Sequence, residues 1–181
     1  MLLAAVFFGP LLIAFVFYYG EIGWRPVSST ANGQLIIPPR LLPDMVLRKN
    51  ATGESPKFRG KWSLIMLGDG SCDEACRSLL YETRQVRKAL SRDRDRVQRV
   101  FYVTTGSLDA EFVKSEHPGL VIIETDAPIA KPLLEAVNDR NPGDIFLADP
   151  IGNLIMRFPP DTGMSGIHTD LKQLLKLSRI G

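Results

Sequence analysis

Hydrophobic positions change spacing several times along the chain between Gly60 and the carboxyl terminus. Short, nearly continuous apolar runs have the length of buried β-strands and are bounded by glycine or polar residues. They occupy residues 61–67, 99–105 and 120–124, and two further runs lie within 144–158. The sequence Asp-Pro-Ile-Gly-Asn separates these last two runs, so we predict a β-hairpin over 144–158.

Between the predicted strands, apolar residues recur every three or four positions, which is the spacing of one face of an α-helix. The clearest pattern covers residues 76–90, and a second amphipathic pattern covers 167–177. Two shorter helices are predicted over 108–116 and 128–137, the latter with Pro128 in its first turn. Strands that alternate with helices predict an α/β domain in which a central sheet is flanked by helices.

The amino-terminal residues 1–19 contain no charged side chain. A helix of this length spans about 28 Å, close to the ~30 Å hydrocarbon core of a membrane. The run is longer than the roughly 7–15 apolar residues of a cleaved signal peptide, and Tyr18, Tyr19 and Trp24 suit a membrane interface. We therefore predict one transmembrane anchor over 1–19, in contact with membrane lipid. Arg25 follows the run and no basic residue precedes it, so charge alone favours a cytoplasmic carboxyl-terminal part and leaves the orientation open.

Residues 20–59 have the composition of a tether that also packs on a domain. Their prolines at 26, 38, 39 and 43 disfavour a helix and favour extended chain. Residues 35–37 are too apolar for a plain linker, and a weak hairpin around Gly53 is expected within 45–58. The predicted organisation is an anchor over 1–19, a Pro-rich tether and packing segment over 20–59, and a folded domain over 60–181.

The charge of the chain gives no general argument for nucleic-acid binding, because 22 basic and 20 acidic residues leave a formal net charge of +2. The most basic stretch, residues 84–99, also contains Asp93 and Asp95, and neither aromatic residues nor a glycine-rich loop accompany it. We interpret it as a solvated helix end and turn and predict no nucleic-acid partner, with contact to a membrane surface or acidic partner as the open alternative. Phosphate-binding-loop, GxSxG, HExxH and zinc-finger patterns are absent from the sequence.

Cys72 and Cys76 are the only cysteines of the chain and lie where the first predicted strand gives way to a helix. The amino terminus of a helix stabilises a thiolate, whereas Asp73 and Glu74 oppose this effect and Arg77 partly offsets them. Residues i and i+4 of a regular helix have β-carbons about 5–6 Å apart, but a disulfide needs about 3.8 Å. A disulfide would therefore require Cys72 to precede the helix, whereas two thiolates could hold one metal ion in either arrangement.

These features together resemble the Sco (SenC/PrrC) family: a strand after Gly60-Lys61-Trp62, C-x-x-x-C opening a helix, and a late D-P-x-G hairpin behind one membrane span. Its members are membrane-anchored, thioredoxin-like proteins that assist assembly of the copper centre of cytochrome c oxidase. The resemblance covers about Gly60–Gly181 and implies a thioredoxin-like fold. It also implies that Cys72 and Cys76 are the redox and copper-binding thiols, and that the partner is an oxidase subunit or another assembly factor.

The chain departs from the family pattern at a copper-ligating histidine. Family members carry this histidine a few residues before the D-P-x-G hairpin, where this chain reads Asp139-Arg140-Asn141-Pro142-Gly143. The two histidines, His117 and His168, lie elsewhere in the sequence, and we interpret them as ordinary loop or cap residues. Residues 73–75 replace the proline-containing form that the family has between its cysteines. Pro142 is a candidate for the cis proline typical of thioredoxin-like sites.

Three functions follow from these observations. The first is a thiol–disulfide protein of oxidase assembly, a possible oxidoreductase, that uses Cys72 and Cys76. The second is a copper(I) carrier with the same two thiolates and an unidentified third ligand, since two soft ligands suit Cu(I) and hold Cu(II) poorly. The third is a non-redox interaction module. A dithiol that cycles favours a domain outside the cytoplasm, which predicts a single-pass protein of the inner membrane with its carboxyl-terminal domain in the periplasm.

Overall fold

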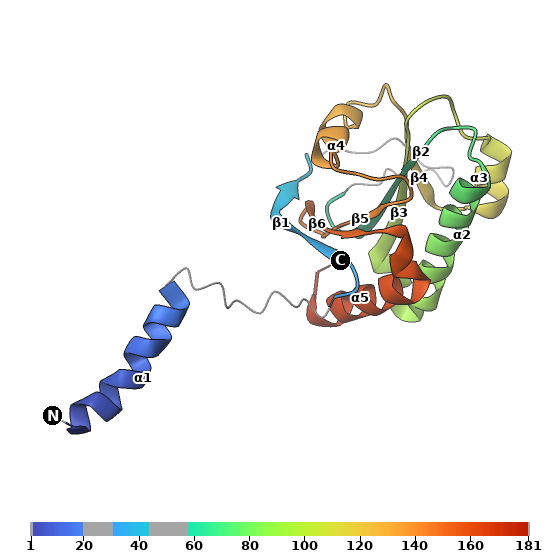
Figure 1. Cartoon of the computed structure of the whole chain (residues 1–181). Coiled ribbons are helices and arrows are strands. Elements are labelled where there is room, and N and C mark those ends of the chain that lie inside the picture. Colours follow the sequence, from blue (N-terminus) through green and yellow to red (C-terminus); the bar gives the residue numbers. More distant parts are fainter. Residues whose placement is uncertain (1, 20–30, 44–57, 181) are drawn as a thin grey trace. The chain divides into compact units, whose positions relative to one another are not determined.

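The computed structural model describes residues 2–19, 31–43 and 58–180, which belong to two compact units, 1–30 and 31–181. In the first unit, α1 (Leu2–Tyr19) is a single helix that contains Pro10 (Figure 1). Large apolar side chains along it, such as those of Phe8 and Leu11, are exposed. None of the helices in the described residues combines the length and the apolar character needed to cross a membrane. The expected amino-terminal helix is present, whereas its membrane span stays a prediction.

The described part of the second unit contains a six-stranded sheet with the order β1-β6-β5-β2-β3-β4. Strands β2, β3 and β4 are parallel, whereas β5 runs antiparallel to β2, β6 to β5 and β1 to β6. The strands are β1 (Gln34–Leu41), β2 (Trp62–Gly68), β3 (Val97–Val103), β4 (Leu120–Ile123), β5 (Ile145–Ala148) and β6 (Asn153–Phe158). The strands predicted between Gly60 and the carboxyl terminus are confirmed, including the closing hairpin of β5 and β6.

Helices cover both faces of this sheet and give the predicted three-layer α/β arrangement (Figure 1). Alternate residues of β2 point to opposite faces, as in any strand. Leu64 and Met66 belong to the apolar cluster shared with α2, α3 and α5, and Ile65 belongs to the cluster shared with α4. The helices are α2 (Glu74–Ala89), α3 (Ala110–Glu116), α4 (Ala130–Ala136) and α5 (Gly163–Leu177), with 3₁₀ turns at Ser91–Arg96 and Pro160–Thr162.

Two sequence-based predictions about prolines are wrong in detail. Helix α4 begins at Ala130, so Pro128 precedes the helix and does not lie in its first turn. Ile37–Pro38 is the one cis peptide bond among the described residues, so the bond before Pro142, the candidate for a cis proline, is not cis. The hairpin expected around Gly53 lies outside the described residues.

Strand β1 brings part of the predicted tether into the sheet. Residues 34–41 are extended, as their prolines favour, and they pair with β6 at the edge of the sheet. The register shifts between Leu35 and Arg40, which is where Pro38 and Pro39 cannot donate a ladder hydrogen bond. The buried carboxylate of Asp170 in α5 holds the residues just before β1, because it accepts hydrogen bonds from Asn32 and Gly33. The boundary drawn at Gly60 between tether and domain stays a prediction.

Candidate redox site

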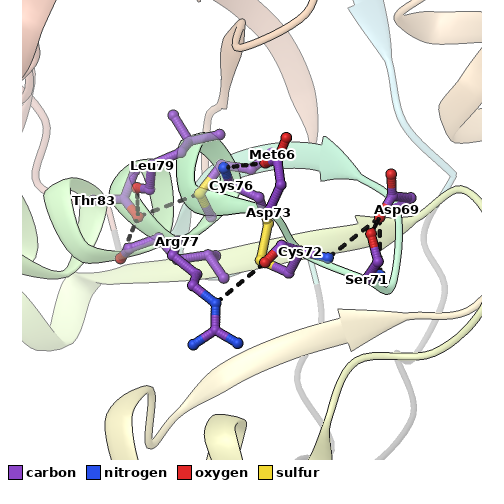
Figure 2. The surroundings of a disulfide bond; sticks show 10 residues. Met66, Asp69, Ser71, Cys72, Asp73, Cys76, Arg77, Leu79 and Thr83 are labelled. Atoms are coloured by element: carbon purple, nitrogen blue, oxygen red, sulfur yellow. Dashed lines mark hydrogen bonds between the residues drawn. A yellow bond between two sulfur atoms is a disulfide. The ribbon is translucent and has the colours of Figure 1, made fainter.

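Cys72 and Cys76 lie at the junction of β2 and α2, and a disulfide joins them (Figure 2). Cys72 precedes the helix with a φ of 42°, and Cys76 lies in the first turn of α2. Asp73 is the N-cap, and its carboxylate accepts a hydrogen bond of 2.9 Å from the Cys76 backbone N–H. The Cα atoms of the two cysteines are 5.1 Å apart. The structure therefore confirms that Cys72 leaves the helical path so that the two sulfurs can meet.

The loop before Cys72 is held by a short network around Asp69. The Asp69 carboxylate accepts hydrogen bonds from the Ser71 hydroxyl, from the Ser71 backbone N–H and from the Cys72 backbone N–H (Figure 2). These bonds, above all that from the Ser71 hydroxyl, lower the pKa of Asp69, so its carboxylate is charged at neutral pH. Gly70 donates a 2.7 Å hydrogen bond to the Thr105 carbonyl, and a Cβ there would lie 2.3 Å from the Ser107 nitrogen. Only glycine permits this close approach of two backbones.

The two cysteines differ in their exposure to solvent. Cys72 is 3% exposed and belongs to the apolar cluster on the α2 face of the sheet. Arg77 fixes the backbone at this point, since its Nε donates to the Cys72 carbonyl at 3.2 Å while its guanidinium lies 4.5 Å from the centre of the Phe112 ring. Cys76 is partly exposed and lines a cavity of about 940 Å³. The disulfide thus joins a buried cysteine to a partly exposed one that lines the cavity.

The cavity beside Cys76 is lined by both apolar and charged residues. Leu79, Ile145 and Ile167 contribute apolar surface from α2, β5 and α5. Asp69, Asp73 and Glu82 place three carboxylates on the β2–α2 side of the cavity. The loop before β5 adds residues 138 and 140–143 to the lining, and these include Arg140. A cavity of this size and composition can accept part of a polypeptide.

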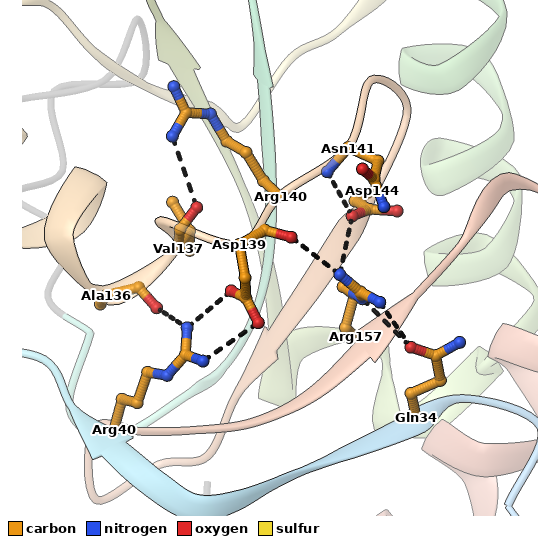
Figure 3. Close-up of polar contacts among 9 residues, drawn as sticks. All are labelled: Gln34, Arg40, Ala136, Val137, Asp139, Arg140, Asn141, Asp144 and Arg157. Carbon is orange, nitrogen blue, oxygen red and sulfur yellow. Dashed lines mark hydrogen bonds and ion pairs between the residues drawn. The ribbon is translucent and has the colours of Figure 1, made fainter.

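Two arginines from neighbouring strands anchor the loop before β5 (Figure 3), which contributes residues to the lining of the cavity. Arg40 of β1 makes two hydrogen bonds, of 2.7 and 3.0 Å, with the Asp139 carboxylate. This bonding lowers the pKa of Asp139. Arg157 of β6 donates to the Asp139 carbonyl at 2.9 Å and lies 3.6 Å from the carboxylate of buried Asp144. Asp144 in turn accepts a 2.7 Å hydrogen bond from the Asn141 backbone N–H. The loop position therefore depends on β1, which comes from the predicted tether.

Neither histidine lines the cavity. His117 ends α3, is 1% exposed, and has its Nδ1 3.5 Å from Nη1 of Arg99. Burial, helped by the nearby charges of Arg99 and Arg84, lowers the pKa of His117 to about 4. The imidazole is therefore neutral at physiological pH. His168 lies in α5 and is half-buried.

The interpretation of residues 84–99 as a solvated stretch is wrong for Arg99. Its side chain is 2% exposed in β3, where it donates a 3.3 Å hydrogen bond to the Leu80 carbonyl. Burial lowers the pKa of Arg99 to about 10. Arg87 also bonds the backbone, at the Val97 carbonyl, while Arg92 and Arg94 are exposed as expected. Part of this basic stretch therefore supports the fold from inside.

Across residues 2–19, 31–43 and 58–180, no three His, Cys, Asp or Glu side chains are grouped so as to hold a metal ion. Two thiolates, released by reduction of the disulfide, can hold Cu(I). Sequence reasoning located both cysteines, but it missed the cavity and the unequal burial of the sulfurs because these depend on segments far apart in the chain.

The chain shows clear similarity to known proteins at the level of fold. A family model described as "Transmembrane-like, thioredoxin-like, C-terminal domain" matches residues 62–178. No curated protein matches the sequence. The solution structure of apo Sco1 from Thermus thermophilus is similar with a TM-score of 0.61, 18% identity, and coverage of 84% of this chain and 99% of that chain.

Two further solved structures extend this comparison. Yeast Sco1 with copper bound has a TM-score of 0.58 and 17% identity, with 83% of this chain and 96% of that chain covered. The thioredoxin domain of a thiol–disulfide oxidoreductase from Bacteroides vulgatus has a TM-score of 0.53 and 15% identity, with 75% of this chain and 95% of that chain covered. These similarities confirm the thioredoxin-like fold that the sequence predicts.

Proposed function

The chain belongs to the family of transmembrane-like, thioredoxin-like C-terminal domains, and from this premise we propose that it is a thiol–disulfide exchange protein whose reactive groups are Cys72 and Cys76. The observation that carries the proposal is the disulfide between these residues at the amino terminus of α2, beside a cavity. Disulfide exchange needs an accessible sulfur and a leaving thiolate, and a helix amino terminus favours the thiolate.

The proposed role of this exchange is assembly of the copper centre of cytochrome c oxidase. Its partner would be an oxidase subunit or another assembly factor. The fold similarity to Sco1 of Thermus thermophilus and of yeast supports this assignment, as does the C-x-x-x-C pattern of Cys72 and Cys76. A dithiol that reduces a partner's disulfide would prepare thiolates of that partner to receive copper.

The test is made in cells that produce the protein. Thiol trapping should find the Cys72–Cys76 pair partly oxidised, and Cys72→Ser or Cys76→Ser should abolish oxidase assembly at normal protein levels. Ser78→Ala, at another residue of α2 that lines the cavity, is the matched control and should support assembly. If both cysteine variants assemble the oxidase fully, exchange is not the function and the non-redox interaction module takes its place.

A copper(I) carrier is the second candidate, and the copper-bound structure of yeast Sco1 favours it. We expect the reduced full chain to bind at most Cu(I), because Cys72 and Cys76 supply two soft ligands and Cu(II) would oxidise them to the disulfide. Either cysteine variant should abolish binding, whereas His168→Ala should not change it. A stable, stoichiometric Cu(II) complex with a thiolate charge-transfer band, lost in His168→Ala, would promote the copper carrier over the exchange protein.

We also propose that α1 attaches the domain to a membrane and that the domain lies outside the cytoplasm, in the periplasm. The exposed apolar side chains of α1 and the absence of charge in its sequence support attachment. The cysteine pair supports an oxidising compartment, where a disulfide can form and be renewed.

A further inference from the structure

We propose that Cys76 Sγ is the sulfur that forms the mixed disulfide, that Cys72 is the leaving and resolving sulfur, and that the partner enters through the cavity with a positively charged polypeptide segment. The inference rests on the proposed exchange function and names the reacting sulfur and the kind of partner. Cys72 and Cys76 share one disulfide but differ in their exposure to solvent.

Access decides which sulfur can be attacked. A thiolate must reach a disulfide sulfur from the side opposite the leaving sulfur. Cys72 is 3% exposed, and its backbone is held by Asp69 and Arg77, so a partner has little approach to its sulfur. Cys76 is partly exposed and lines the cavity, so we expect a partner to reach its Sγ through the cavity.

The exchange balances with a partner dithiol as the reductant. A partner thiolate attacks Cys76 Sγ, an intermolecular S–S bond forms, and the Cys72–Cys76 bond breaks as Cys72 leaves with the electron pair as a thiolate. The second partner thiolate then attacks the partner's own sulfur in the mixed disulfide and expels Cys76 as a thiolate. The partner loses two electrons and becomes a disulfide, and the cysteine pair gains them. In the reverse direction, the Cys76 thiolate attacks a partner disulfide and Cys72 resolves the mixed disulfide.

The charges around the cavity indicate the partner segment. Asp69, Asp73 and Glu82 contribute three carboxylates to the lining, against the single guanidinium of Arg140. The pKa of Asp69 is lowered by its hydrogen bonds, so this group stays charged. Such an excess attracts cations and repels anions. The apolar part of the lining, which includes Leu79 and Ile167, suits the side chains of a polypeptide.

The first experiment locates the reacting sulfur in the oxidised full chain. A capped tripeptide with one cysteine between two lysines is added, N-ethylmaleimide caps the released thiol after a short time, and tandem mass spectrometry reads both positions. We expect the product with the peptide on Cys76 and the cap on Cys72 to be the main one. Its amount should exceed that of the product with these two positions exchanged by about tenfold or more. Reduced Cys72→Ser and Cys76→Ser give a second measurement, since Cys72→Ser should react about tenfold faster with 2-hydroxyethyl disulfide.

The second experiment measures charge selectivity. The lysine-flanked tripeptide is compared with one that carries glutamates, and each rate is divided by the same peptide's rate with 2-hydroxyethyl disulfide. The normalised rate of the lysine peptide should exceed that of the glutamate peptide by about threefold to tenfold. About 0.5 M NaCl should reduce this ratio of normalised rates. Glu82→Gln should lower the ratio and Arg140→Gln should raise it, because both side chains line the cavity and carry opposite charges.

The outcomes separate this inference from the function on which it rests. A peptide adduct mainly on Cys72, or a normalised ratio near one that neither variant changes, would overturn the inference while exchange itself stands. If neither sulfur of the oxidised chain exchanges with any thiol, the proposed function fails. Adducts on Cys76 with the expected charge ratios support both.

Discussion

The imidazole of His117 shows how one buried residue makes stability depend on pH. Its pKa is about 4 in the folded chain, against about 6.5 in an unfolded one. Between these values the unfolded state takes up a proton that the folded state does not. Stability is therefore complete above about pH 6.5 and falls as the pH is lowered to about 4, by on the order of 2–3 kcal/mol. Urea unfolding of the full chain at pH 7 and at pH 4.5 measures this loss.

His117→Asn is the matched variant, because its amide oxygen can accept from Arg99 but does not titrate. The variant should lose distinctly less stability than the wild type over the same pH interval. The lowered pKa values of Asp69 and Asp139 act at lower pH and leave this comparison intact. An equal loss in wild type and variant would show that another group causes the acid sensitivity.

Gly70 gives a second prediction at the residue scale. Gly70→Ala should lower the free energy of unfolding by about 1–3 kcal/mol, because its Cβ would lie 2.3 Å from the backbone nitrogen of Ser107. Gly106→Ala is the control: its φ is 68°, but the nearest atom to its Cβ would be 3.9 Å away, so only about 1 kcal/mol is expected from the left-handed backbone. Urea unfolding compares the two, and a larger loss in Gly106→Ala would contradict the steric argument.

At the scale of elements, Asp170 links α5 to the segment that leads into β1. Asp170→Ala would leave the backbone N–H groups of Asn32 and Gly33 without their acceptor. We expect this change to lower the free energy of unfolding by about 2–3 kcal/mol and to speed amide hydrogen exchange in β1 more than in β2. Lys172→Ala, at an exposed position of the same helix, should have little effect on either quantity. Unchanged exchange in β1 would show that β6 alone holds this strand.

The elements that sequence patterns predicted well are those with one strong periodicity. Strand β2 is a continuous apolar run, and α2 has a clear apolar face and a capping Asp73, so local residues decide both. Strand β1 was predicted only as extended chain, because its two prolines hide the pairing with β6. The burial of Arg99 was missed for a related reason: a charged residue in a basic stretch gives no sign that the Leu80 carbonyl will accept its hydrogen bond.

At the scale of the whole domain, the site combines segments that the sequence does not show to be close. The two cysteines and their order relative to α2 were predicted, since strand, loop and helix follow each other directly in the chain. The cavity needs the end of β2, the start of α2, the loop before β5 and the start of α5 at once. The loop before β5 is in turn fixed by Arg40 and Arg157, from β1 and β6. Such a site becomes visible only when the sheet order is known.

The last prediction concerns the whole protein in its compartment. Alkaline phosphatase fused after Gly181 should be active and a GFP fusion there should be dark, because we propose that the domain lies outside the cytoplasm. The full chain should also remain in the membrane fraction after alkaline carbonate treatment, whereas a chain without residues 2–19 should not, since exposed apolar side chains of α1 such as Phe8 and Leu11 would be the attachment. Bright GFP together with inactive phosphatase would place Cys72 and Cys76 in a reducing compartment, where a stable disulfide does not persist. That result would discard the exchange and the copper proposals in their present form.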